Sequence, residues 1–102
     1  MPNQLIPRPL LESAARRFKV LSQPVRLQIL NHLYTNGEMN VQALVAATDQ
    51  QQANVSKHLR RMADAGLVVR RKDGLYAYYR IADPSLSGLC LLVCGRLRQE
   101  MD

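Results

Sequence analysis

Apolar residues recur every three or four positions through the first two thirds of the chain, which places them on one face of a helix. The spacing predicts four helices, over residues 10–21, 25–35, 41–47 and 51–65. Ser22 and Pro24 suit the start of the second helix, and Asn40 suits the start of the third. Gly37 and Gly66 are expected to end helices, because glycine adopts the positive φ of a helix C-terminus at little cost.

The pattern then changes to that of strands. Residues 67–72 and 75–81 alternate or run apolar and flank Asp73-Gly74, a dipeptide typical of a two-residue hairpin loop. A final helix over residues 85–101 is expected to follow Asp83-Pro84. The pattern therefore predicts an α+β, mainly helical domain with about five helices and a two-stranded β-hairpin.

Length and composition fit one domain. The chain has 102 residues, of which 47% are hydrophobic and 22% charged, ordinary values for a globular protein. Residues 1–8 are expected to form a flexible arm before a domain over residues 9–102. The longest apolar run, Leu89–Cys94, is far shorter than the roughly 20 residues of a membrane span. Residues 1–10 lack the apolar core of a secretory signal, so we expect a cytoplasmic protein without membrane contact.

The third and fourth predicted helices are joined by about three residues, which is the helix-turn-helix arrangement. From Gln51 to Arg80 the chain carries seven basic and two acidic residues, so this segment holds five of the six net positive charges. Taken alone, such a cluster could be a solvated surface. On the second helix of a helix-turn-helix and on the hairpin after it, the cluster favours binding of double-stranded DNA.

The fourth helix separates an apolar face from a polar one. Val55, Leu59 and Met62 form its apolar face at 100° per residue. Gln52 and Asn54 near its start can hydrogen-bond base edges, since amide side chains suit adenine. The basic side chains on its outer face suit phosphates, and the basic hairpin tip is expected to reach either the flanking minor groove or the DNA backbone. The predicted DNA-binding set is Gln51, Gln52, Ala53, Asn54, Ser56, Lys57, Arg60, Arg61, Arg70, Arg71 and Lys72.

Four stretches together resemble the ArsR/SmtB family of winged-helix repressors, over about residues 14–95. They are 18–30 (FKVLSQPVRLQIL), 55–59 (VSKHL), 65–68 (AGLV) and 74–79 (GLYAYY). The resemblance implies a homodimer paired through the first and last helices, bound to an imperfect palindromic operator and released by an inducer. It also implies that base- and phosphate-contacting positions are occupied by Gln52, Ala53, Ser56 and Lys57.

Two metal sites of that family are not matched. The cysteine pair that many members carry at the start of the third helix is replaced here by residues 38–42, Glu-Met-Asn-Val-Gln. The zinc site on the last helix retains Asp83, but its other positions hold Ser85, Arg96 and Gln99. A cationic arginine repels a metal ion, so neither site is expected.

Cys90 and Cys94 remain as the candidate sensor. They lie one turn apart on the predicted last helix, and Arg98 one turn further on favours the thiolate. Thiolates bind trivalent arsenic and soft metals and react with oxidants. The chain is therefore expected to be a repressor that arsenite, a soft metal or a reactive sulfur species releases. The alternative is a regulator that does not respond to thiol reagents, whose cysteines only pack the dimer interface.

No cofactor besides such an inducer and no enzymatic activity are expected. Ser56, Lys57 and His58 are consecutive on one helix, so they do not converge as a catalytic group, and no glycine-rich phosphate loop is present. His58 faces the apolar side, which predicts a core or hydrogen-bonding role. Arg26 is expected either to touch a DNA phosphate or to pair with an acid such as Asp64. A protein-binding winged helix is a third class, disfavoured because the basic residues are retained.

Overall fold

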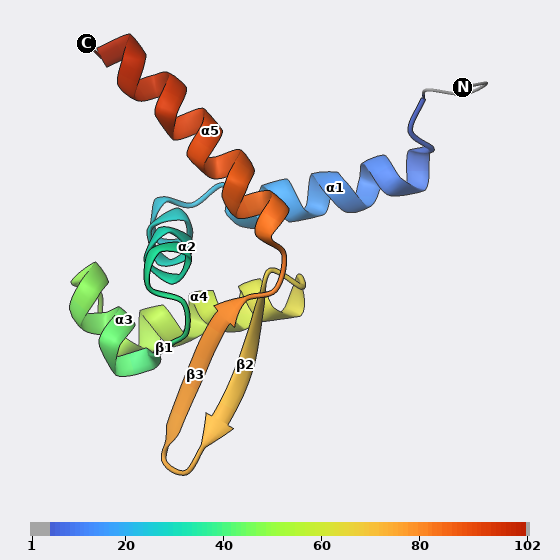
Figure 1. Ribbon diagram of the computed structural model, residues 1–102. Helices are drawn as coiled ribbons and strands as arrows, with labels where there is room; N and C mark the ends of the chain where they lie inside the picture. The colour runs from blue at the N-terminus through green and yellow to red at the C-terminus, as the bar shows by residue number, and fades with distance from the viewer. Residues whose placement is uncertain (1–4, 102) are drawn as a thin grey trace.

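A computed structural model describes residues 5–101 of the chain (Figure 1). Over this range the chain forms five helices and three strands. In order they are α1 (Arg8–Leu21), α2 (Pro24–Asn36), β1 (Met39–Asn40), α3 (Val41–Thr48), α4 (Gln52–Asp64), β2 (Val68–Asp73), β3 (Tyr76–Ile81) and α5 (Pro84–Met101). The middle helices and the sheet make one body, from which α1 and α5 project in different directions (Figure 1). This is the predicted winged helix-turn-helix.

The helix-turn-helix has the predicted boundaries to within one residue. Asn40 caps α3, since its Oδ1 accepts a hydrogen bond from the Ala43 backbone N–H at 2.7 Å. The turn to α4 passes through Asp49, which adopts a left-handed φ of 56°. Three residues thus separate α3 from α4, and the second helix of the motif crosses the base of the hairpin (Figure 1).

Two expectations about α1 and α2 are corrected. Ser22 does not cap α2; its hydroxyl donates to the Lys19 carbonyl at 2.7 Å and closes α1 instead. The residue before α2 is Gln23, and Pro24 occupies the first turn as predicted, where no N–H is required. Helix α1 begins at Arg8, the last residue of the predicted arm. Residues 1–4 of that arm, and Asp102, lie outside the described residues.

The hairpin is present, but its loop lies one residue later than predicted. Asp73 pairs with Tyr76 across the strands, so the two loop residues are Gly74 and Leu75. Gly74 has a φ of +61°, and a positive φ at the first loop residue alone is typical of a type II′ turn. The sheet also has a third strand, in the order β1-β3-β2, because Met39–Asn40 pairs with β3. Two residues are too few to predict as a strand from the sequence.

The core lies between α2, α3 and α4 and the base of the sheet. Its fully buried side chains are Ile29, Leu33, Leu44, Val55, Leu59, Met62 and Leu67. Three of them come from α4, so the predicted apolar face of this helix is confirmed. Burial of that stripe fixes the rotation of α4 and turns its basic face outward.

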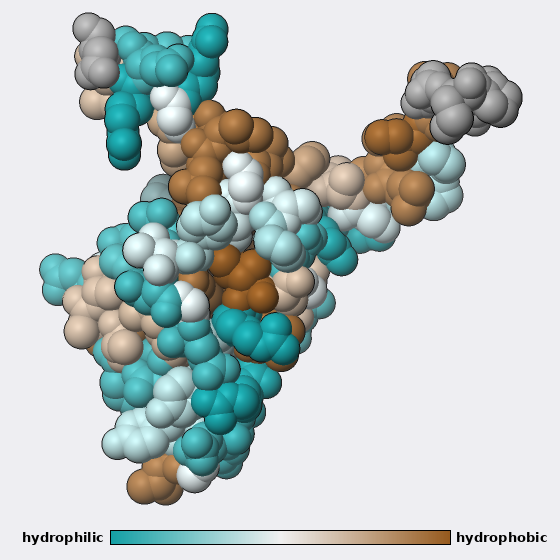
Figure 2. All heavy atoms as spheres, in the orientation of Figure 1, coloured by the Kyte–Doolittle hydropathy of each residue, from teal (hydrophilic) through white to brown (hydrophobic). Residues whose placement is uncertain are grey.

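Helices α1 and α5 keep much of their apolar surface uncovered. Leu10 and Phe18 on α1 are 60% and 49% exposed, and Leu92 and Leu97 on α5 are 74% and 51% exposed. Figure 2 shows apolar side chains gathered on both projecting helices. Large clustered apolar patches are unusual on a monomer surface and mark interaction sites.

Over residues 5–101, none of the helices has the length and apolar character needed to cross a membrane.

Candidate nucleic-acid interface

Helix α4 presents most of the predicted DNA-binding side chains to solvent. The exposed members at its start and along its outer face are Gln51, Gln52, Ala53, Lys57, Arg60 and Arg61. Ser56 is half-buried. Among residues 5–101, the side chains of Lys57, Arg60 and Arg61 form no ion pair with a carboxylate. Their charges are therefore available to an external polyanion.

Asn54 is less accessible than Gln52 and Ala53, and its side chain is hydrogen-bonded to the turn before α4. Its Nδ2 donates to the Oε1 of Gln50 at 2.8 Å, and the side chain is half-buried. The base-reading role remains a prediction, and it now includes Gln50, which the sequence pattern alone did not single out. The signal was available, since Gln50 and Asn54 are four residues apart across the start of α4.

The three basic residues of β2 differ in how far they are engaged. Arg71 forms a bidentate pair with Glu38, with Nε–Oε2 and Nη2–Oε1 distances of 3.0 and 2.7 Å. Its guanidinium also lies 4.7 Å from the centroid of the Tyr78 ring. The hydrogen-bonded pair with Glu38 lowers the pKa of Glu38 and raises that of Arg71. Arg70 and Lys72 have no ion pair within the described part of the chain. Since residues alternate along a strand, these two share the other face of β2.

A buried polar contact ties α2 to α4. The Arg26 Nε donates to the His58 Nδ1 at 2.9 Å, and its Nη1 donates to the Val20 carbonyl at 2.9 Å. Both side chains are 6% exposed. Burial and the nearby positive charges, that of Arg26 first, lower the pKa of His58. The predicted hydrogen-bonding role of His58 is confirmed. Pairing of Arg26 with an acid such as Asp64, one of the two alternatives that the sequence left open, is wrong.

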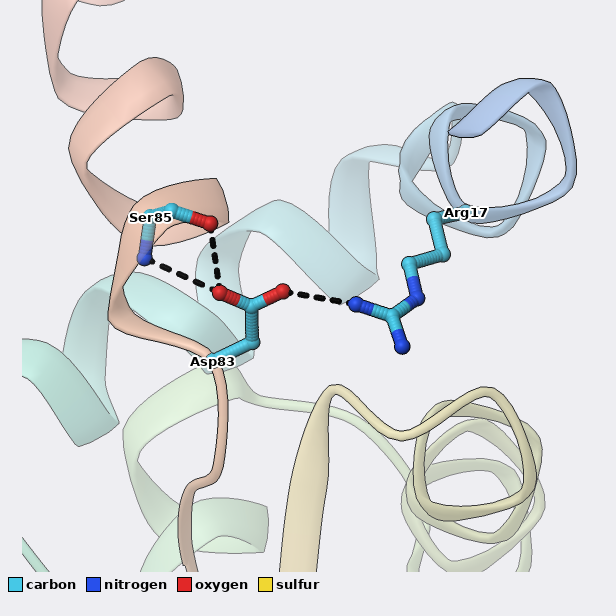
Figure 3. A network of polar contacts seen from close by, with 3 residues as sticks. All are labelled: Arg17, Asp83 and Ser85. Atoms are coloured by element: carbon cyan, nitrogen blue, oxygen red, sulfur yellow. Dashed lines mark hydrogen bonds and ion pairs between the residues drawn. The ribbon is translucent and has the colours of Figure 1, made fainter. Parts of the chain in front are cut away.

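A second polar contact joins α1 to the start of α5 (Figure 3). Asp83 accepts from the Arg17 Nη1 at 2.8 Å through one oxygen, and from the Ser85 backbone N–H at 3.1 Å and hydroxyl through the other. These hydrogen bonds, chiefly that from the Ser85 hydroxyl, hold the pKa of Asp83 below its usual value. Asp83, the residue that the sequence resemblance matched to a zinc site, here caps α5.

Cys90 and Cys94 lie together on α5, as their spacing predicts. Cys90 is half-buried and Cys94 is exposed. Burial, and then the neighbouring Cys94, raise the pKa of the Cys90 thiol, which favours the protonated form. No group of three or more histidine, cysteine or acidic side chains within residues 5–101 is placed to hold a metal ion. A soft ligand bound by three thiols would therefore need a thiol from a second chain.

Comparison of the sequence and the fold with those of known proteins identifies the family of this chain. A sequence model of the MarR family matches residues 23–75, which run from the start of α2 to the hairpin loop and omit α1 and α5. The transcriptional repressor PagR of Bacillus anthracis is 36% identical over 84 residues, which are 81% of this chain and 83% of PagR. This match extends beyond the part that the MarR model covers.

Two solved structures match nearly the whole chain. One is the homodimeric winged helix-turn-helix DNA-binding domain of Mb0332 from Mycobacterium bovis, a possible ArsR-family regulator. It superposes with a TM-score of 0.79 at 33% identity and covers 98% of this chain and 94% of that domain. The other is AntR, an antimony-specific transcriptional repressor, with a TM-score of 0.85 at 30% identity, covering 98% of this chain and 91% of AntR. Both matches include α1 and α5 as well as the helix-turn-helix. The chain therefore belongs to the ArsR/SmtB family of winged helix-turn-helix transcriptional regulators.

Proposed function

We propose that this chain is a homodimeric repressor that binds an imperfect palindromic operator in double-stranded DNA through α4 and the β2–β3 hairpin, here called the wing. The observation that carries the proposal is the outward basic face of α4, whose Lys57, Arg60 and Arg61 have no carboxylate partner among residues 5–101. PagR and AntR are named transcriptional repressors, and the Mb0332 domain is described as homodimeric and DNA-binding. The proposed role is regulatory and not catalytic.

The dimer is proposed to form through α1 and α5. These helices carry the exposed apolar side chains described above, and they project from the body where a second chain can cover them (Figures 1 and 2). A two-fold dimer would present two copies of α4 to successive major grooves. Half-sites should then lie about 34–36 Å apart, one turn of the duplex.

Within each half-site, α4 is proposed to enter the major groove. Gln51, Gln52, Ala53 and Ser56 near its start face the bases, together with Asn54 held by Gln50. Contacts to phosphates come from Lys57, Arg60 and Arg61 on α4 and from Arg70, Arg71 and Lys72 on the wing. Because phosphate contacts fix register and base contacts specify sequence, the two groups should respond differently to mutation.

The test is fluorescence anisotropy of the reduced protein on DNA from upstream of its own coding sequence, beside a scrambled duplex of equal length. We expect the upstream duplex to bind at least about 10³-fold more tightly, the lower range for specific binding. Equal affinity for both duplexes at every salt concentration would contradict a sequence-specific repressor.

We further propose that thiol-reactive inducers act at Cys90 and Cys94. The two side chains are neighbours on α5, where the exposed Cys94 is accessible and where a second chain would add two more thiols. AntR, a structural neighbour, is antimony-specific by name, and antimony and arsenic share a preference for thiolates. The competing function is a constitutive regulator. It is favoured by the half-buried position and raised pKa of Cys90.

Arsenite and a persulfide donor, titrated separately onto the preformed complex, distinguish these two functions. If one agent releases the wild type but not the Cys90→Ser/Cys94→Ser double variant, the two thiols form the sensor. If both proteins are released equally, or neither is, the cysteines only pack.

A further inference from the structure

A wide cleft separates α1 from α4, with the start of α2 at its side. Its volume is about 950 Å³, within the range of small-molecule sites. The cations that line it come from three helices: Arg16 and Lys19 from α1, Arg26 from α2, and Lys57, Arg60 and Arg61 from α4. Arg17 also borders it but is paired with Asp83, and the one carboxylate in the lining is Asp64. The cleft therefore carries a large excess of positive charge.

The most deeply buried of these cations is Arg26. Its guanidinium is hydrogen-bonded to the His58 ring and the Val20 carbonyl, which are both uncharged acceptors. Within residues 5–101 no carboxylate lies close enough to form an ion pair with it. Burial, and then the positive charge of Arg61, lower the pKa of Arg26. A buried charge is costly unless an opposite charge meets it, and the described chain supplies none.

The exposed cations of the cleft are not neutralised by carboxylates of the described chain either, apart from Arg17. Lys19, Lys57, Arg60 and Arg61 form no ion pair with an acid of the described chain, and Arg16 bonds only to the Ser13 hydroxyl at 3.0 Å. Guanidinium groups suit phosphate oxygens because they donate in pairs with a matching geometry. The lining is thus chemically complementary to an oxyanion with two or more negative charges.

We propose that the cleft binds a small phosphate-bearing molecule, with Arg26 at its inner end and the α1 and α4 cations around it. The burial of Arg26 favours a small molecule over a DNA strand. Arg26 is 6% exposed and lines the cleft, so a small anion that enters the cleft is better suited to meet it than a stiff duplex. Binding of a DNA backbone would need only the exposed cations at the mouth of the cleft, and it would not need Arg26.

Such a ligand would weaken operator binding. It would occupy Lys57, Arg60 and Arg61, which we propose contact DNA phosphates, and two anions cannot share these cations at full strength. By linkage, DNA would lower the affinity for the ligand by the same factor. This consequence rests on the proposed function, whereas binding of the ligand to the free protein does not.

The test is calorimetric titration of the DNA-free, full-length protein with pyrophosphate at constant ionic strength. The cleft variant is Arg16→Gln/Lys19→Gln, two exposed residues that are not in the predicted DNA-binding set. The control is Arg70→Gln/Lys72→Gln, which removes equal charge from the wing, outside the cleft. We expect saturable binding of one pyrophosphate per chain, weakened at least tenfold in the cleft variant and less than twofold in the control.

Three results would overturn the proposal. These are no saturable binding of pyrophosphate, equal weakening in both variants, or a cleft variant that binds pyrophosphate normally yet loses operator affinity. The last would assign the cleft to the DNA backbone. If wild type binds pyrophosphate as expected but no duplex at all, the proposed function fails and the anion site stands.

Discussion

The Arg26 Nε donates a hydrogen bond to the His58 Nδ1 across 32 residues of sequence, and this buried pair holds α4 against α2. Since Nδ1 is the acceptor, His58 is neutral in the folded protein, and its pKa is held below the usual 6.5. In the unfolded chain His58 takes up a proton near pH 6.5, whereas in the folded chain it does not. Stability should therefore fall as the pH drops below about 6.5, by at most about 1.4 kcal/mol per pH unit.

Chemical denaturation between pH 7.5 and 5.5 checks this dependence. His58→Asn is the informative variant, because the asparagine Oδ1 lies near the position of Nδ1 and accepts without titrating. Its stability should change less with pH than that of the wild type over this range. If His58→Asn keeps the wild-type slope, the pH dependence comes from other groups.

This contact also marks where prediction from the sequence ends. The apolar stripe of α4 and the Asn40 cap are local patterns of spacing and side-chain chemistry, so the sequence predicts both. The direction of His58 toward the core follows from the same stripe. The identity of its hydrogen-bond partner cannot be predicted in this way, because the choice of Arg26 over other groups depends on how α2 packs on α4. For Arg26 the sequence left open a DNA phosphate or an acid, and the structure pairs it with a neutral ring instead.

The wing shows a similar division. A hairpin near residue 74 follows from the glycine and the flanking strands, whereas its loop is displaced by one residue from the prediction. The Asp-Gly rule assumes that aspartate is the first loop residue, but here Asp73 still pairs with Tyr76 and Gly74 takes that place. The pairing of Arg71 with Glu38 likewise needs β1 beside β3, a strand too short to predict. The basic residues of α1 that line the cleft were visible in the sequence but were not connected to α4.

Because Arg71 is paired with Glu38, it should contribute less to DNA binding than Arg70 and Lys72 do. Arg70→Gln and Lys72→Gln should each weaken binding to specific and scrambled duplexes alike. Each should flatten the plot of log K against log salt by about 0.9 for every phosphate that the variant no longer neutralises, and by twice that for a dimer. Arg71→Gln should change the slope less, since its guanidinium is already neutralised by Glu38. Anisotropy titrations from 50 to 200 mM salt measure all three slopes. A larger change of slope for Arg71→Gln than for its neighbours would contradict the assignment.

Gln50 and Asn54 are expected to act as one unit in reading the operator. The amide of Asn54 is oriented by the Gln50 Oε1 at 2.8 Å, so removal of either side chain should relax the preference for the specific duplex by a similar factor. A double-mutant cycle with Gln50→Ala and Asn54→Ala checks this on specific and scrambled DNA. We expect the double variant to be little less specific than either single variant, because the effects of substituting two residues in contact are not additive. Additive effects would mean that the two side chains act separately.

The apolar face of α5 supplies the last prediction, which concerns assembly. Leu92 is 74% exposed in the single chain, and covering such a side chain contributes about 1.5–3 kcal/mol, counted twice in a symmetric dimer. Leu92→Arg should therefore convert the dimer to a folded monomer. Light scattering should show its mass fall from twice the chain mass to 11.5 kDa. Leu75→Arg is the matched control, because Leu75 is 96% exposed at the wing loop, far from α5 (Figure 1). If Leu92→Arg stays dimeric, α5 does not form the interface in the way proposed. The four thiols of Cys90 and Cys94 would then no longer be expected to meet at the two-fold axis.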